Sequence, residues 1–181
     1  EKESIQYEED ALYLIAQKAD GALRDALSIF DRLATFTQKN ITLAKAAEVL
    51  NILDYDQYLN IVDLAHQNKI SETLFAFNEI VKKGFDSHLF IAGLGNHFRD
   101  LMMAQNPQTL SLIEVGDQTK IKFSEQSKSW NVQQLIDAIE ICNHADINYK
   151  NSKNPRLTVE IALMQLSSLT AVGVQSKKKN S

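Results

Sequence analysis

Hydrophobic residues recur every three to four positions along most of the chain, which is the spacing of amphipathic helices. The first two such stretches cover residues 8–18 and 22–36, with Leu23 and Leu27 on the apolar face of the second. Gly21 separates them, so a helical hairpin is expected after a frayed start over residues 1–7. Residues 37–40 are polar and form a connection. The hairpin is too short to bury its own core, so we expect it to pack against another part of the protein.

From residue 41 onward, most of the expected helices have a clear start signal. A polar N-cap side chain accepts a hydrogen bond from the first turn, and Pro is favoured at the first helical position. A Gln placed three residues after the cap adds a capping box in two of them. The weaker pattern of residues 108–130 predicts a short helix over 110–115, with Leu110, Leu112, Ile113 and Val115 as its apolar residues, and a polar one over 119–127. The predicted starts are Thr42, Asp54 with Gln57, Ser71, Asp86, Asn131 with Gln134, and Asn154–Pro155.

The composition agrees with an all-α fold. The 181 residues include only 6 Gly and 2 Pro, and β-folds need many turns that carry these residues. Gly93 and Gly95 nevertheless fall inside a predicted helix, where each costs about 1 kcal/mol relative to Ala. The close approach of a neighbouring helix would offset that cost.

The net charge of −4 and the pI of about 5.6 argue against a domain that binds nucleic acid by itself.

Side chains with catalytic or metal-binding chemistry form no recognisable constellation. The four histidines, at positions 66, 88, 97 and 144, lack any metal-ligand spacing and are expected at the surface or at helix ends. Cys142, the single cysteine, falls on an apolar stripe and is expected in the core. No apolar run is long enough to cross a membrane. We therefore predict no catalytic residue, no metal site and no membrane contact.

The segment Gly21-Ala22-Leu23-Arg24-Asp25-Ala26-Leu27-Ser28 carries the strongest functional signal. Arg24 falls in the first turn of a helix, where the positive end of the helix dipole disfavours a cation unless an anion joins it. A missing anionic ligand is one explanation. A plain surface arginine beside Asp25 is the other, and the residues alone leave both open.

This octapeptide resembles the sensor-2 motif of the gamma/tau subunits of DNA polymerase III, the motor subunits of the bacterial clamp loader, whose pattern is close to G-x-x-R-D-A-L-S. Residues 47–57 resemble the entry into the third domain of that family. Asn154-Pro155-Arg156-Leu157 resembles the start of its final collar helix. The pair Asn51-Ile52 departs from the family, which has a small, Gly-containing pair there. The resemblance covers most of residues 8–170.

The resemblance implies an all-α chain with a short helical hairpin from an AAA+ lid, followed by a helical-bundle collar. The implied parts are the end of the lid over 1–40, the collar over 41–173 and a disordered tail or linker over 174–181. No P-loop sequence is present and the chain lacks an initiator Met. We therefore expect part of a longer cytoplasmic protein whose nucleotide-binding domain is elsewhere.

The same resemblance implies the function. Arg24 would reach the γ-phosphate of ATP, held with Mg in the full-length protein, while this part alone would bind no cofactor and have no ATPase activity. The collar would assemble with gamma/tau, delta and delta-prime subunits into a pentamer that loads the sliding clamp onto primed DNA during replication. Apolar Phe77, Phe90 and Ile91 are either interface candidates or ordinary core residues. The alternative function is a helical adaptor without a nucleotide role, and a DNA-binding helical domain fits the acidic balance less well.

Overall fold

The computed structural model describes residues 5–176 of the chain, with side chains as far as Thr170. Within this range it has ten helices and two very short strands, which confirms the predicted helical fold. The elements are β1 (Gln6–Tyr7), α1 (Glu9–Lys18), α2 (Leu23–Phe36), β2 (Asn40–Ile41), α3 (Leu43–Leu50), α4 (Tyr55–His66), α5 (Ile70–Lys82), α6 (Ser87–Ala104), α7 (Pro107–Leu110), α8 (Asp117–Ser127), α9 (Val132–Tyr149) and α10 (Pro155–Ser176).

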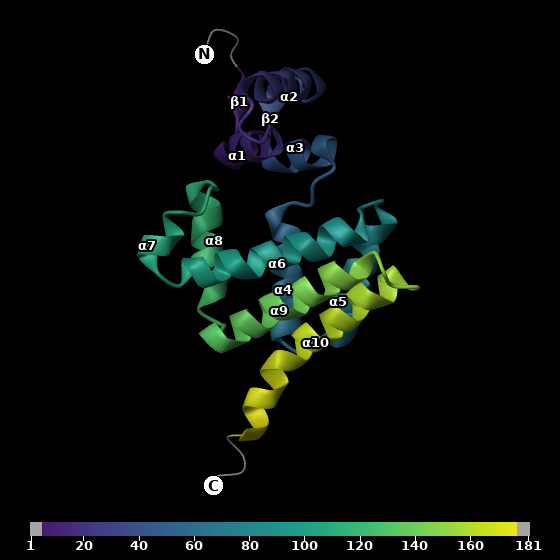
Figure 1. The fold of residues 1–181 in the computed structure, drawn as a ribbon. Helices are drawn as coiled ribbons and strands as arrows, with labels where there is room; N and C mark the ends of the chain where they lie inside the picture. The colour runs from purple at the N-terminus through teal and green to yellow at the C-terminus, as the bar shows by residue number, and fades with distance from the viewer. Residues whose placement is uncertain (1–4, 177–181) are drawn as a thin grey trace.

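A small unit at the N-terminal end consists of the elements from β1 to α3 (Figure 1). Its core is one cluster, in which Leu14 of α1, Leu33 of α2 and Leu50 of α3 are buried together. The hairpin therefore packs against α3, which supplies the apolar surface that it could not supply itself. Leu23 and Leu27 of α2 are exposed, so the prediction that they belong to the core face is wrong.

The remaining helices form the larger body in Figure 1, in which α6 packs against α9 and α9 against α10. Helices α4 and α5 also pack against α10, while α8 lies against α6. This body has its own continuous hydrophobic core. Phe77, Phe90 and Ile91 are fully buried in that core. They are therefore ordinary core residues of this chain and not interface candidates.

Several predicted helix starts are confirmed by cap hydrogen bonds. The side chains of Thr42, Asp54 and Asp86 accept bonds from first-turn amides, and Asn131 with Gln134 completes a capping box. Such caps satisfy N–H groups that have no partner within the helix.

Other sequence predictions need correction. Helix α5 begins at Ile70, so Ser71 is inside it and does not cap it. Gln6 and Tyr7 are not frayed, because they pair in parallel with Asn40 and Ile41. Between α7 and α8, Ile113 and Val115 are buried in the core without belonging to a helix. The last helix continues to Ser176, beyond the predicted end at 173, while residues 177–181 of the predicted tail lie outside the described residues.

The two glycines within α6 mark close approaches of other helices, as predicted. A Cβ on Gly93 would collide with the hydroxyl of Tyr58 on α4. A Cβ on Gly95 would lie 3.2 Å from the Cβ of Cys142 on α9, which is tighter than an ordinary contact. The absence of a side chain therefore lets the Tyr58 side chain of α4, and Cys142 of α9, lie directly against α6.

The contact at Gly93 gives a test of this packing. We expect Gly93→Ala to lower the free energy of unfolding by about 1–3 kcal/mol, the usual cost of an overpacked core. This loss outweighs the gain of about 1 kcal/mol from helix propensity. Urea unfolding followed by circular dichroism measures the change. Asn96→Ala, an exposed position on the same helix, is the control and should not destabilise the protein; a stabilised Gly93→Ala would contradict the packing argument.

Candidate functional site

Arg24 lies in the first turn of α2, after a turn in which Asp20 and Gly21 have positive φ angles of 49° and 78°. Its side chain is exposed, and within the described residues no carboxylate lies within ion-pair distance of its guanidinium. The N-cap residue, Ala22, offers no side-chain acceptor to the first turn. A free cation and uncapped backbone N–H groups therefore occur at the same helix end, an arrangement that suits an anion.

A second candidate site lies where the N-terminal unit contacts the larger body. Asp10 of α1 makes the main polar contact there. One oxygen of its carboxylate accepts a hydrogen bond of 2.6 Å from the backbone N–H of Gly116, and the other accepts one of 2.8 Å from the hydroxyl of Thr119. Gly116 is the N-cap residue of α8. Asp10 therefore caps α8 from a different packing unit, with a negative charge at the positive end of the helix dipole.

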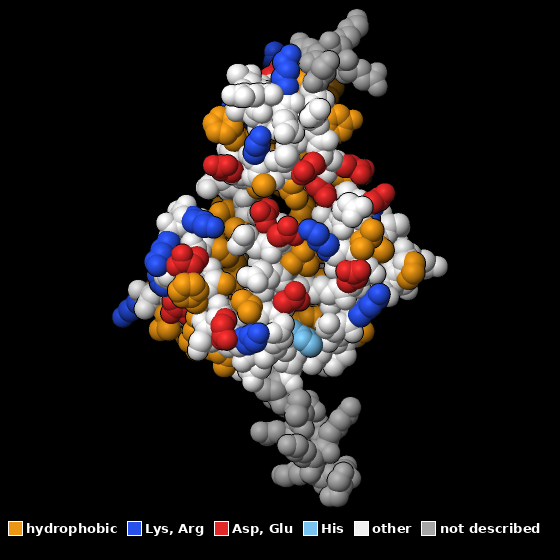
Figure 2. Space-filling model, turned by 180° about the vertical axis from the view of Figure 1, so that it is seen from behind, with side chains coloured by type: hydrophobic (Ala, Val, Ile, Leu, Met, Phe, Trp, Pro, Cys, Tyr) orange, Lys and Arg blue, Asp and Glu red, His pale blue; other side chains and the backbone are white. Residues whose placement is uncertain are grey.

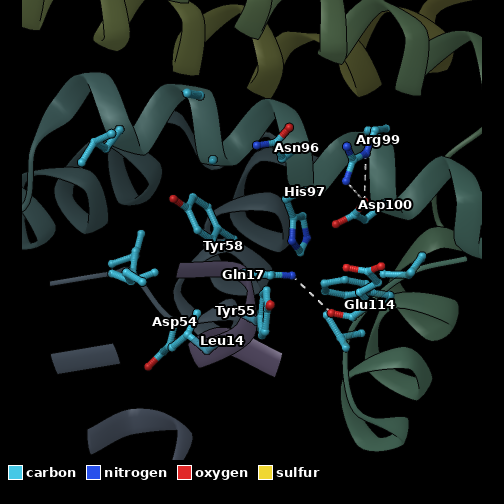
Figure 3. Close-up of a pocket in the computed structure, with 18 of the residues that line it drawn as sticks. Leu14, Gln17, Asp54, Tyr55, Tyr58, Asn96, His97, Arg99, Asp100 and Glu114 are labelled. Atoms are coloured by element: carbon cyan, nitrogen blue, oxygen red, sulfur yellow. Dashed lines mark hydrogen bonds and ion pairs between the residues drawn. The ribbon is translucent and has the colours of Figure 1, made fainter. Parts of the chain in front are cut away.

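Another hydrogen bond supports this contact. The side-chain amide of Gln17, also on α1, donates a hydrogen bond of 3.2 Å to the backbone carbonyl of Glu114 (Figure 3). Between the units the chain runs through residues 51–54, where Asn51 ends α3 in the left-handed conformation with a φ of 52°. The short loop over 111–116 is thus held against α1 at two points.

A cavity of about 700 Å³ lies behind these contacts. Its lining comes from both units, including Leu14 and Gln17 of α1, Tyr55 and Tyr58 of α4, and one face of α6 (Figure 3). In the space-filling view of Figure 2, acidic and hydrophobic side chains surround a hollow at the level where the small unit meets the larger body. Cavities of this size, at the contact between two packing units, commonly hold small molecules.

Four ionisable side chains in this cavity have shifted pKa values, each chiefly because of burial. Burial raises the pKa of Tyr55 to about 12, with Asp10 and Asp100 adding to the shift, and it raises that of Tyr58 as well. Burial lowers the pKa of His97 to about 4, so that its imidazole is neutral at pH 7. Burial also raises the pKa of Asp100 and outweighs the opposite effect of Arg99. Clusters of shifted pKa values are typical of functional sites.

His97 differs from its expected surface position. It is 3% exposed, and its Nε2 lies 2.8 Å from the side-chain oxygen of Gln126, whose amide donates to Leu59 and Asp63. Because Gln126 offers His97 an acceptor, Nε2 carries the proton, and Nδ1 has no hydrogen-bond partner. No signal in the sequence distinguishes His97 from the other histidines.

The described residues contain no group of His, Cys, Asp and Glu side chains that could hold a metal ion. Cys142 is buried in the core, as predicted, and burial raises the pKa of its thiol. No helix in the part of the chain that the structure describes is long and apolar enough to cross a membrane.

Comparison with known proteins now assigns the chain to a family. Residues 1–39 match the DNA polymerase III clamp loader subunit, ATPase lid domain. Residues 41–179 match domain III of the DNA polymerase III subunits gamma and tau. The chain belongs to this gamma/tau family. The two matches meet at residue 40, whereas the first hydrophobic cluster of the structure continues through α3 to Leu50.

The chain is also similar to individual proteins. The chain is 29% identical to DNA polymerase III subunit tau of Bacillus subtilis, over 91% of this chain and 29% of that protein. It is 28% identical to the plant protein STICHEL-like 2 of Arabidopsis thaliana, over 92% of this chain and 19% of that protein. The chain thus spans less than a third of either relative.

A solved structure shows the same fold. The DNA clamp loader delta protein of Bacillus subtilis superposes with a TM-score of 0.57 at 20% sequence identity. The match covers 92% of this chain and 52% of that one. At this level of identity the likeness concerns the fold.

The contact made by Asp10 gives a second test. We expect Asp10→Ala to lower the free energy of unfolding by about 1–3 kcal/mol, because it leaves the Gly116 amide without its partner. Glu9→Ala removes a neighbouring, exposed acid from the same helix turn and should cost no more than about 0.5 kcal/mol. Urea titration of the two variants compares them. Equal losses would mean that the contact with α8 contributes nothing beyond the dipole of α1.

Proposed function

We propose that this chain serves in a clamp-loader ATPase subunit of DNA polymerase III, in which residues 1–40 end an ATPase lid and residues 41–173 form the collar. The observation that carries the proposal is the succession of the two family matches, lid and then domain III, along one chain. In the full-length protein ATP and Mg would be bound by another domain. The whole complex would load the sliding clamp onto primed DNA.

In this proposal Arg24 is the lid residue that senses ATP. It has what such a role needs: an exposed guanidinium with no acidic partner within the described residues, next to an uncapped helix start. A hydrogen bond between a guanidinium and phosphate is charge-assisted, and it would form only when the γ-phosphate is present. The bond would therefore favour one orientation of the lid in the ATP state.

The collar is proposed to join the gamma/tau, delta and delta-prime subunits in a pentamer. The fold shared with a clamp loader delta protein supports this proposal, because similar domains can pack side by side around a ring. Each subunit then needs two different faces, one for each neighbour.

Mutation of Arg24 in the full-length protein tests the sensor role. We expect Arg24→Ala to reduce ATP-dependent clamp loading by about ten- to a hundredfold, the value of one charge-assisted hydrogen bond. Arg32→Ala is the matched control, because Arg32 is an exposed arginine on the same helix. Circular dichroism should show both variants folded.

Wild-type loading by the Arg24→Ala protein would reject the sensor role and favour an adaptor without a nucleotide function. Equal loss in both variants would reject a specific role for Arg24.

A further inference from the structure

The cavity between the two units has a continuous aromatic wall. Tyr55 of α4 meets Phe123 of α8 edge to face, with ring centroids 5.7 Å apart, and Phe123 meets His97 in the same way at 5.0 Å. His97 stacks in turn with Tyr58 at 6.0 Å. Since the four rings come from three helices and support one another, this wall is fixed by the fold.

One carboxylate at this cavity has unused hydrogen-bonding capacity. The side chain of Asp100 is only 14% exposed, and both hydrogen bonds from Arg99 go to the same oxygen, Oδ1, at 2.7 and 3.0 Å. Within the described residues no hydrogen bond reaches Oδ2. Burial raises the pKa of this carboxyl, and this effect outweighs the opposite effect of Arg99. A further donor at Oδ2 would stabilise its charged form.

The charges around the cavity favour a cation over an anion. Asp54, Asp100 and Glu114 line it, against Lys18 and Arg99. Arg99 and Asp100 pair with each other, which leaves Asp54 and Glu114 against Lys18, and Asp10 adds a further negative charge close enough to influence Tyr55. His97 adds no positive charge at neutral pH. Aromatic faces attract cations through their quadrupoles, so the aromatic wall, like the carboxylates, favours a cationic ligand.

We propose that this cavity binds a small organic cation, an amine or amidine on a flat apolar body. Its N–H groups would donate to Oδ2 of Asp100, and its body would lie along the rings of Tyr55 and Tyr58. The site is separate from Arg24, which is on α2 and does not line the cavity. The proposal is therefore independent of the ATP-sensing role.

A matched pair of probes tests this site in the 181-residue chain. Benzamidine carries the cationic amidine, and benzamide has nearly the same shape without the charge. We expect benzamidine to bind at least about tenfold more tightly in a calorimetric titration, as one charge-assisted hydrogen bond predicts. Asp100→Asn should abolish the difference. Asp31→Asn, which removes an exposed acid on α2, should preserve it.

Amide chemical shifts of the wild-type chain show where benzamidine binds, even if the Asp100→Asn variant is unstable. Benzamidine should shift the side-chain amides of Gln17 and Asn96, which line the cavity. Equal affinity for the two probes, shifts confined to another surface, or no binding of benzamidine would each overturn the proposal. An acetylated Gly-Arg-Gly amide binding as tightly as benzamidine would also overturn it, because the site would then accept a protein side chain rather than a small molecule.

Discussion

The shortest polar contact between the lid helices and the collar is made by one carboxylate. Asp10 reaches from α1 to the start of α8 and accepts hydrogen bonds from Gly116 and Thr119. Glycine at position 116 leaves room for this contact, because a Cβ there would lie 2.8 Å from an oxygen of Asp10 and displace the carboxylate. Elsewhere the two units have separate hydrophobic cores. The polar contacts of Asp10 and Gln17, rather than a shared hydrophobic core, therefore hold the two units in their relative orientation beside the cavity.

This arrangement suits the movable lid of the proposed function. A contact made of a few hydrogen bonds is worth only a few kcal/mol, since each contributes about 0.5–1.5 kcal/mol, or up to about 3 when a charge takes part. That is comparable to what one bond between Arg24 and a phosphate could supply in the proposed function. Two interactions of similar strength can compete, so nucleotide binding at one end of the lid could shift its position on the collar.

Local signals in the sequence predicted the helices well. Caps such as Asp86 and the Asn131–Gln134 box depend on neighbouring residues, and the structure has them where the sequence placed them. The prediction failed where distant residues decide. Ser71 has the right chemistry for a cap but lies inside α5. The pairing of Tyr7 with Ile41 joins residues far apart in the chain.

The candidate sites show the same contrast between local sequence signals, which were predicted, and contacts between distant residues, which were not. Arg24 was found through a contiguous motif. The cavity was not predicted, because its residues come from α1, α4, α6 and α8 and share no local pattern. His97 resembles the other histidines in the sequence, and it is buried by contacts of α6 with Tyr58 of α4 and Phe123 of α8. Asp10 is one of two acids in the first turn of α1, and only the fold places the start of α8 beside it.

The distance between the two units tests the central claim most directly. Spin labels at Ser28→Cys on α2 and Gln133→Cys on α9 occupy exposed positions, while Cys142 is buried and should remain unlabelled. Pulsed electron paramagnetic resonance should give one narrow distance distribution for the otherwise unchanged chain. Adding Asp10→Ala should broaden that distribution. An equally narrow, unshifted distribution would contradict the claim that Asp10 fixes the lid on the collar.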